Sequence, residues 1–143
     1  MSESFSLVLT ARGGAGQAVC GEALVSTHPF SPRYDLDRAT GVISRIDHDL
    51  AGKSLANKIV VFPAAKGGVA AGWALYALKA AGLAPLAFVF TTVNPVFVQG
   101  AVHAGIPILH GISPDPVAVL ATGMRVQADP AALTIRVLPP VHA

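Results

Sequence analysis

A glycine loop with one lysine is the first place where this sequence could do chemistry. Lys66, Gly67 and Gly68 follow the apolar run 59–63 and precede a stretch with helical spacing. A helix start offers unpaired N–H groups with a partial positive charge, and glycines let a ligand approach the backbone. Lys66 adds a full charge, so a carboxylate or a phosphate suits the loop. The run matches neither the P-loop nor the G-x-G-x-x-G pattern, and similar junctions also serve plain packing.

A second set of polar residues follows the next apolar run, 86–90. Asn94 precedes Pro95, the order of an N-cap and a proline in the first helical turn, and Gln99 comes about one turn later. Ligands of open parallel sheets bind beyond the carboxyl ends of the strands, so both loops should face one crevice. Asn94 could equally be a plain helix cap and Gln99 an exposed helix residue. The predicted substrate-binding residues are Lys66, Gly67, Gly68, Asn94 and Gln99, and no catalytic residue is assigned.

Cysteine and histidine give no support for a metal in this chain. Cys20 is the single cysteine, so thiolates of this chain alone cannot hold an iron–sulfur cluster or zinc. The apolar neighbours of Cys20 predict a small core residue. No metal site is expected, because no close pair with ligand spacing occurs among His28, His48, His103, His110 and His142. A serine hydrolase has no support either, because the chain lacks a G-x-S-x-G motif.

The middle of the chain alternates between predicted strands and helices. Strands are expected at 59–63, 86–90 and 106–109, with helices at 68–81 and from Pro95 to about 104. Such a β-α-β-α-β order implies parallel strands joined by right-handed crossovers. The first helix is expected to place Trp73, Leu75 and Leu78 in the core.

The two ends of the chain favour antiparallel pairing. Residues 5–10 and 18–25 read as strands of a hairpin or bulged ribbon around the glycine-rich turn 12–16. The remaining expected elements are an ordered loop at 28–41, a strand at 42–46, a short helix at 115–121, and strands at 124–128 and 133–138. The predicted fold is α/β, a single three-layer β/β/α domain over residues 1–143 with a parallel central sheet and additional antiparallel strands.

The composition restricts the kinds of partner. The 143 residues are 52% hydrophobic but only 13% charged, so part of the surface is expected to be covered by another protein. A net charge of +2 with scattered basic residues argues against nucleic acid. The uncharged window 80–102 is interrupted by proline, asparagine and glycine, so no membrane span is expected. The first residues lack the pattern of a secretory signal, and a cytoplasmic location is expected.

The order of several motifs resembles the small subunit, or swivel domain, of the aconitase X family. These are GEALV at 21–25, H-x-L-x-G-K-S-L at 48–55, the glycine loop, A-P at 84–85 and G-I-P at 105–107. The resemblance implies a swivelling domain in an iron–sulfur-dependent hydro-lyase, whose relatives dehydrate hydroxy acids such as phosphomevalonate or cis-3-hydroxyproline. It further implies that a separate large subunit holds the cluster, that this chain binds no cofactor, and that it is not active alone on its small carboxylate substrate.

One departure from the family concerns the glycine loop. Dehydratases of the family usually carry a pattern like G-R-G-S-x-x-G-S, and one of its serines is thought to move a proton. The corresponding run here is 65–72, AKGGVAAG, in which the serine hydroxyls are missing and Lys66 stands where the family often has a basic residue. Either the large subunit supplies the proton-transfer group, or the substrate and reaction differ, or the chain has another role.

Two other functions compete with the dehydratase. The run 98–112 and the hairpin after it also resemble mobile phosphohistidine domains, with Gln99 about where their phosphorylated histidine stands. An amide cannot accept a phosphoryl group, so a carrier would need His103 instead, and we interpret this likeness as a shared fold. The third candidate is a non-catalytic ligand-binding or scaffold module, against which the surplus apolar surface argues.

Overall fold

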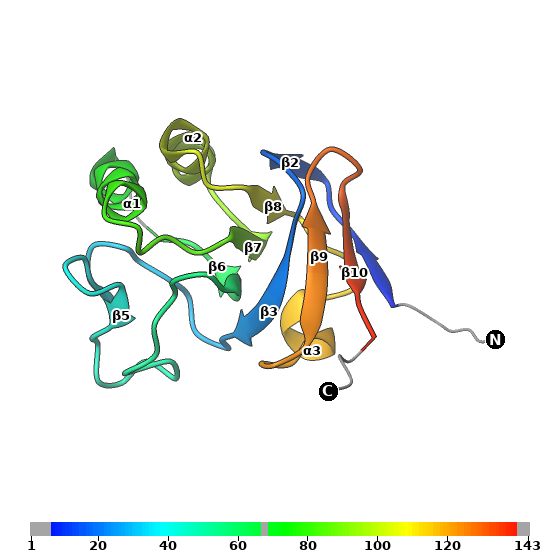
Figure 1. Ribbon diagram of the computed structural model, residues 1–143, viewed down its shortest axis with the longest axis horizontal. Coiled ribbons are helices and arrows are strands. Elements are labelled where there is room, and N and C mark those ends of the chain that lie inside the picture. Colours follow the sequence, from blue (N-terminus) through cyan, green and yellow to red (C-terminus); the bar gives the residue numbers. More distant parts are fainter. Residues whose placement is uncertain (1–6, 67–68, 140–143) are drawn as a thin grey trace.

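One eight-stranded mixed sheet organises the computed structural model, which describes residues 7–66 and 69–139 (Figure 1). The strand order is β1-β10-β9-β3-β6-β7-β8-β2, and β4 and β5 form a separate two-stranded sheet. The strands are β1 Val8–Thr10, β2 Gly13–Ala15, β3 Val19–Val25, β4 Leu36–Asp37, β5 Val42–Ile43, β6 Ile59–Ala64, β7 Ala87–Thr92, β8 Ile108–His110, β9 Arg125–Asp129 and β10 Thr134–Val137. The helices are α1 Val69–Ala80, α2 Pro95–Ala104 and α3 Pro116–Val119.

The parallel half of the sheet follows the order predicted from the sequence. β3, β6, β7 and β8 are parallel neighbours, and α1 and α2 connect β6 to β7 and β7 to β8. Because both crossovers step the same way along the sheet, both helices lie on one face (Figure 1). β9, β10 and β1 continue the sheet by antiparallel pairing. The predicted α/β fold, with a parallel centre and antiparallel additions, is therefore confirmed.

Alternating side chains of the central strands build two cores, one on each face of the sheet. Val60, Phe62, Phe88 and Phe90 pack under α1 and α2 in one cluster of buried residues. Ile59, Val61, Ala87 and Val89 point to the other face, where they meet buried residues of the antiparallel strands. Strands buried on both faces appear as continuous apolar runs in the sequence, which is why they were recognisable.

The hairpin predicted near the N-terminus is wrong. β1 pairs with β10, while β3 pairs with β9 and β6, so the two strands are not neighbours. The glycine-rich segment between them forms β2, which pairs with β8 at the far edge of the sheet. A β-carbon on Gly14 would lie 2.8 Å from the carbonyl oxygen of Ile108, so the missing side chain allows this close pairing. The glycines here serve strand contact and not only a turn.

Two residues predicted to be in the core are exposed instead. Trp73 is 66% exposed, because α1 buries the stripe of Ala71, Ala74, Leu75 and Leu78 and turns Trp73 away from the sheet. The burial predicted for Leu75 and Leu78 is confirmed. Cys20 is also exposed, in the first half of β3, where exposed and half-buried positions alternate. Among the described residues, no helix is long and apolar enough to cross a membrane.

The helix boundaries follow from identifiable caps. Asn94 caps α2 by accepting a 2.8 Å hydrogen bond from the backbone N–H of Phe97, and Pro95 takes the first helical position. Gly105 ends α2 with a left-handed φ of 76°. Asp115 caps the short α3 in the same way, through the N–H of Val117. These caps fix the start of α2 directly behind the carboxyl end of β7.

Candidate functional site

A cavity of about 370 Å³ lies beyond the carboxyl ends of the parallel strands β3 and β6. That volume falls within the range of small-molecule sites. Three chain segments meet there: the loop after β3, the loop around Asp47, and the start of the glycine loop after β6. The lining residues are His28, Pro29, Ser31, Tyr34, Asp35, Arg45, Asp47, His48 and Lys66. The cavity therefore combines the predicted Lys66 with polar groups that come from a different part of the chain.

Backbone pairing fixes Lys66 at the cavity. Its N–H donates a 2.8 Å hydrogen bond to the carbonyl oxygen of Phe30, and Phe30 and Ala65 form a parallel bridge. Phe30 itself is fully buried and stacks on Phe62 of β6, with ring centroids 4.7 Å apart. The side chain of Lys66 is exposed and forms no ion pair with any residue in the described ranges 7–66 and 69–139. The backbone of Lys66 is thus fixed at the cavity, and its side-chain charge is available to a ligand.

The carboxylate of Asp49 joins two of the cavity's loops. It accepts hydrogen bonds from the hydroxyl of the fully buried Ser26 at 2.5 Å and from the backbone N–H of Thr27 at 2.8 Å. The Thr27 hydroxyl adds a third hydrogen bond at 3.0 Å. Partial burial alone would raise the pKa of Asp49, but these hydrogen bonds together lower it below its ordinary value. The charged carboxylate therefore ties the loop after β3 to the loop at 45–50.

Two histidines beside Asp49 are held by backbone groups. The N–H of Asp49 donates to Nδ1 of His28 at 3.0 Å, and the N–H of Leu50 donates to Nδ1 of His48 at 3.1 Å. Nε2 of His48 lies 3.1 Å from the carbonyl oxygen of Pro29. Since Nδ1 of each ring accepts a hydrogen bond, each neutral ring carries its proton on Nε2. His48 is consequently a structural donor to Pro29, with both of its nitrogens engaged.

The same three side chains could be taken for a metal site. One ligand atom each from His28, His48 and Asp49 lies within 4.8 Å of the others, a proximity that the sequence spacing did not indicate. Both Nδ1 atoms accept backbone N–H groups and the carboxylate accepts from Ser26 and Thr27, however, so a metal would have to compete with these hydrogen bonds. The arrangement fits a hydrogen-bonded junction between loops better than a metal centre.

An iron–sulfur cluster does not fit the residues of this chain. Thiolate ligation needs several cysteines, and the sequence contains only Cys20. Cys20 lies exposed on β3, next to Gln127 of β9 in the sheet register, and is not among the residues that line the cavity.

Arg45 contributes a second, neutralised charge to the cavity. Its guanidinium donates to the buried Asp35 at 3.2 Å and to Asp47 at 2.8 Å. The hydrogen bond to Asp35, followed by that to Asp47, raises the pKa of Arg45, and the hydrogen bond from Arg45 lowers the pKa of Asp47. Two carboxylates thus more than offset the charge of Arg45, which leaves Lys66 as the cation of the cavity lining that can attract an anion.

Of the other predicted site residues that the structure describes, Asn94 lies at the same edge of the sheet as Lys66, and Gln99 lies in the helical layer. Ala64 pairs with Thr92, so Lys66 and Asn94 follow neighbouring strand ends. Gln99 lines a separate hollow of about 230 Å³ between α1 and α2, together with Gly72, Trp73, Val96, Gly100 and His103. Gly67 and Gly68 lie outside the described residues. The expected single crevice is therefore divided between a loop cavity and a hollow in the helical layer.

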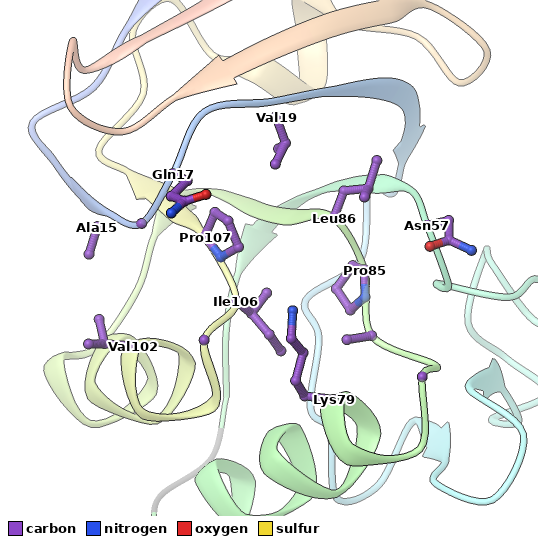
Figure 2. Close-up of a pocket in the computed structure, with 14 residues that line it drawn as sticks. Ala15, Gln17, Val19, Asn57, Lys79, Pro85, Leu86, Val102, Ile106 and Pro107 are labelled. Carbon is purple, nitrogen blue, oxygen red and sulfur yellow. The ribbon is translucent and has the colours of Figure 1, made fainter.

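A larger hollow of about 630 Å³ lies at the opposite, amino-terminal edge of the parallel strands (Figure 2). Its walls come from segments that precede β6, β7 and β8, including Asn57, Pro85 and Pro107, and Lys79 of α1 extends into it (Figure 2). Ligands of parallel sheets gather at the other edge. The lining of this hollow has three polar side chains, Gln17, Asn57 and Lys79, against eight in the cavity beside Lys66, which remains the candidate site.

Sequence reasoning missed most of the polar lining of the cavity. His28 and His48 are 20 positions apart and come together because the loop after β3 folds back on the loop that follows β5. The H-x-L-x-G-K-S-L segment contains His48, but as one motif in the order typical of the family it does not indicate what His48 contacts. Asp35 and Arg45 carried no recognisable spacing.

Comparison with known proteins agrees with the motif order. The family model described as "Aconitase X swivel domain" matches residues 8–137. The phosphomevalonate dehydratase small subunit of Pyrococcus abyssi is 35% identical over 122 residues, which cover 85% of this chain and 92% of that protein. The protein of the same name from Thermococcus gammatolerans is 36% identical over 121 residues, covering 85% and 90%.

Solved structures show the same fold. The crystal structure of Thermococcus kodakaraensis aconitase X in its holo-form matches with a TM-score of 0.87 and 32% identity, covering 93% of this chain and 99% of that chain. A solution NMR structure of a UPF0107 protein matches with a TM-score of 0.80 and 27% identity, covering 92% and 99%. The prediction of an aconitase X small-subunit type of protein is confirmed. The chain belongs to the aconitase X family and corresponds to its swivel domain.

Proposed function

We propose that this chain is the small subunit of a dehydratase and that it presents Lys66 to the anionic group of a small hydroxy-carboxylate. The observation that carries the proposal is the cavity at the carboxyl ends of β3 and β6, where Lys66 is a cation without an acidic partner among the described residues. The relatives' name suggests phosphomevalonate, which bears both a carboxylate and a phosphate, as the first substrate to test. Gly67, Gly68 and Asn94 are proposed to complete the binding loop.

A large subunit is the proposed partner and the proposed holder of an iron–sulfur cluster. The relatives are named small subunits, and this chain has a single, exposed cysteine. Elimination of water also needs a group that moves a proton, and the loop serines typical of the family are absent here. We therefore assign binding and closure of the site to this chain and the proton transfer to the large subunit. The proposed compartment is the cytoplasm.

The outer face of α1 and α2 is the proposed docking surface for the large subunit. Trp73, Tyr76 and Val96 are large side chains that remain exposed there. Trp73 and Val96 lie near the starts of their helices, which directly follow the strand ends that border the candidate site. A partner that closes over the site would cover this face as well, and Gln99 in the hollow beside Trp73 would then lie in the interface.

Co-expression with the candidate large subunit tests the proposal. The two proteins should elute as one complex whose interface buries more than about 1,500 Å² in total, the range of stable interfaces. With phosphomevalonate, the complex should form a product lighter than the substrate by one water, as detected by mass spectrometry. Separate elution at micromolar concentration, with no turnover on mixing, would reject the small-subunit assignment.

A further inference from the structure

The cavity beside Lys66 contains a second polar group, on His28, that faces no partner among residues 7–66 and 69–139. We propose that His28 is a neutral hydrogen-bond donor to the anion that Lys66 attracts. The anion is the phosphate or the carboxylate group of the ligand. As regards the natural substrate, this assignment rests on the proposed function. The state of the ring and its response to simple anions do not depend on that function, so the two ideas can fail separately.

The environment of His28 fixes which nitrogen carries the proton. Nδ1 accepts the backbone N–H of Asp49 at 3.0 Å, so the neutral ring has its proton on Nε2. Nε2 has no hydrogen-bond partner in the described part of the chain. The side chain is 44% exposed and lines the cavity. His28 therefore offers one N–H donor to whatever enters.

The surrounding contacts keep the ring in this orientation. Its edge-to-face contact with His48 has ring centroids 5.2 Å apart and an interplanar angle of 81°. His48 is buried, with its own nitrogens engaged, and Asp49 is fixed by Ser26 and Thr27. Turning the ring over would break the hydrogen bond from Asp49. The donor is thus held in position before a ligand arrives, which reduces the entropic cost of binding.

Lys66 and His28 would act on an anion in different ways. Lys66 supplies a compact charge on a flexible stem, whereas Nε2–H of His28 supplies a directed hydrogen bond. Arg45 adds no net attraction, because the two carboxylates of Asp35 and Asp47 more than offset its charge. Nε2 of the neutral ring has no lone pair, so His28 cannot remove a proton through that atom. Its role is to position the anion, and proton transfer is left to another group.

Nuclear magnetic resonance on the chain alone tests the state of the ring. Long-range 1H–15N spectra should show His28 as the neutral Nε2–H tautomer. Addition of inorganic phosphate, and separately of acetate, should shift the His28 ring signals, and the anion that shifts them at the lower concentration identifies the preferred oxyanion. Lys66→Ala should abolish these shifts. A proton on Nδ1, or a ring that responds to neither anion, would overturn the proposal.

Two substitutions test the role of His28 in the complex. In His28→Asn the side-chain oxygen replaces Nδ1 as acceptor for Asp49, but no donor reaches the position of Nε2. In His28→Gln the amide nitrogen reaches that position. We expect KM to rise about ten- to a hundredfold in the Asn variant, as for loss of a hydrogen bond to a charged group, with kcat within a few-fold. The Gln variant should recover part of this loss.

The controls separate the possible failures. The melting temperature of His28→Asn should equal that of the wild type within a few degrees, since the Asp49 junction is retained. His28→Gln loses the acceptor for the N–H of Asp49, and its melting temperature measures that cost. An unchanged KM in His28→Asn would show that the ring does not touch the substrate. If the wild-type complex has no dehydratase activity, the proposed function fails, while the phosphate and acetate titrations still decide whether His28 and Lys66 bind an oxyanion.

Discussion

At the scale of single residues, Asp49 is the group on which the candidate site depends most. Its carboxylate binds Ser26 and Thr27, and its backbone N–H holds His28. One residue therefore positions both the loop and the ring that face the cavity. The side chain is 32% exposed, so solvent weakens each of these hydrogen bonds relative to a buried pair.

Asp49→Ala is expected to lower the free energy of unfolding by about 1–2 kcal/mol at pH 7. It leaves the Thr27 N–H without its acceptor and the buried Ser26 hydroxyl with only the carbonyl oxygen of His28, at 3.1 Å. The folded-state pKa of Asp49 is lowered, so its contribution is present above the ordinary carboxyl pKa of about 4 and is lost as the pH falls through the folded-state value. Urea denaturation of wild type and variant at pH 7 and at about pH 3 measures both effects.

Asp47→Ala is the matched control for this prediction. Asp47 is a neighbouring carboxylate that pairs with the exposed Arg45 at the surface. Its removal should change stability little at either pH. Two results would contradict the role assigned to Asp49. One is an equal loss of unfolding free energy in both variants, and the other is a stability difference between wild type and Asp49→Ala that is as large in acid as at pH 7.

At the scale of elements, the close crossing of α1 and α2 explains why the helical layer exposes Trp73. Gly72 and Gly100 face each other at the crossing, and a β-carbon on Gly100 would lie 2.8 Å from the α-carbon of Gly72. The helices touch there through their backbones, which leaves no space for the Trp73 ring between them. The ring lies instead on the outer face, beside the hollow that contains Gln99.

Gly100→Ala should therefore destabilise the chain by about 1–3 kcal/mol, the usual cost of overpacking, in spite of the better helix propensity of alanine. Gly72→Ala is the control, because its β-carbon would lie 3.4 Å from the α-carbon of Gly100, at the limit of ordinary contact. Thermal and urea unfolding should show a loss only for Gly100→Ala. A larger loss for Gly72→Ala would mean that the crossing is not as described.

The proposed docking surface belongs to the same elements. Trp73→Ala with Val96→Ser should weaken binding to the large subunit at least tenfold, since buried aromatic residues dominate interface energies. Val8→Ser, on the edge strand β1 at the other end of the sheet, removes a matched exposed apolar side chain and should leave affinity unchanged. Isothermal titration calorimetry gives the dissociation constants. Equal affinities for all variants would place the interface elsewhere.

At the scale of the whole molecule, local patterns predicted the parallel half of the fold and long-range pairing decided the rest. Runs such as 59–63 and 86–90 and the Asn94-Pro95 cap are local signals, and the structure contains the corresponding elements within a few residues. The N-terminal strands lack such a signal for their partners. β1 pairs with β10 more than a hundred residues away, and an expected hairpin was replaced by this contact.

The candidate site shows the same division between local and long-range information. Lys66 was recognised because a lysine in a glycine loop before a helix is a local pattern that indicates anion binding. Four polar residues of the site were not recognised, because they contact one another only where two loops meet in the folded chain. These are His28, Asp35, Arg45 and Asp49. Trp73 was misplaced because helical spacing identifies an apolar side chain but not which side of a narrow two-helix layer it faces.

The central claim is that the edge of the sheet at Lys66, and not the larger hollow at the opposite edge, faces the substrate. Steady-state kinetics of the complex with Lys66→Ala and Lys79→Ala tests it most directly, since both substitutions remove one exposed lysine from the wall of a hollow. We predict that Lys66→Ala lowers kcat/KM about ten- to a hundredfold with an unchanged melting temperature, and that Lys79→Ala has no effect. Full activity of Lys66→Ala, or a loss confined to Lys79→Ala, would contradict the account.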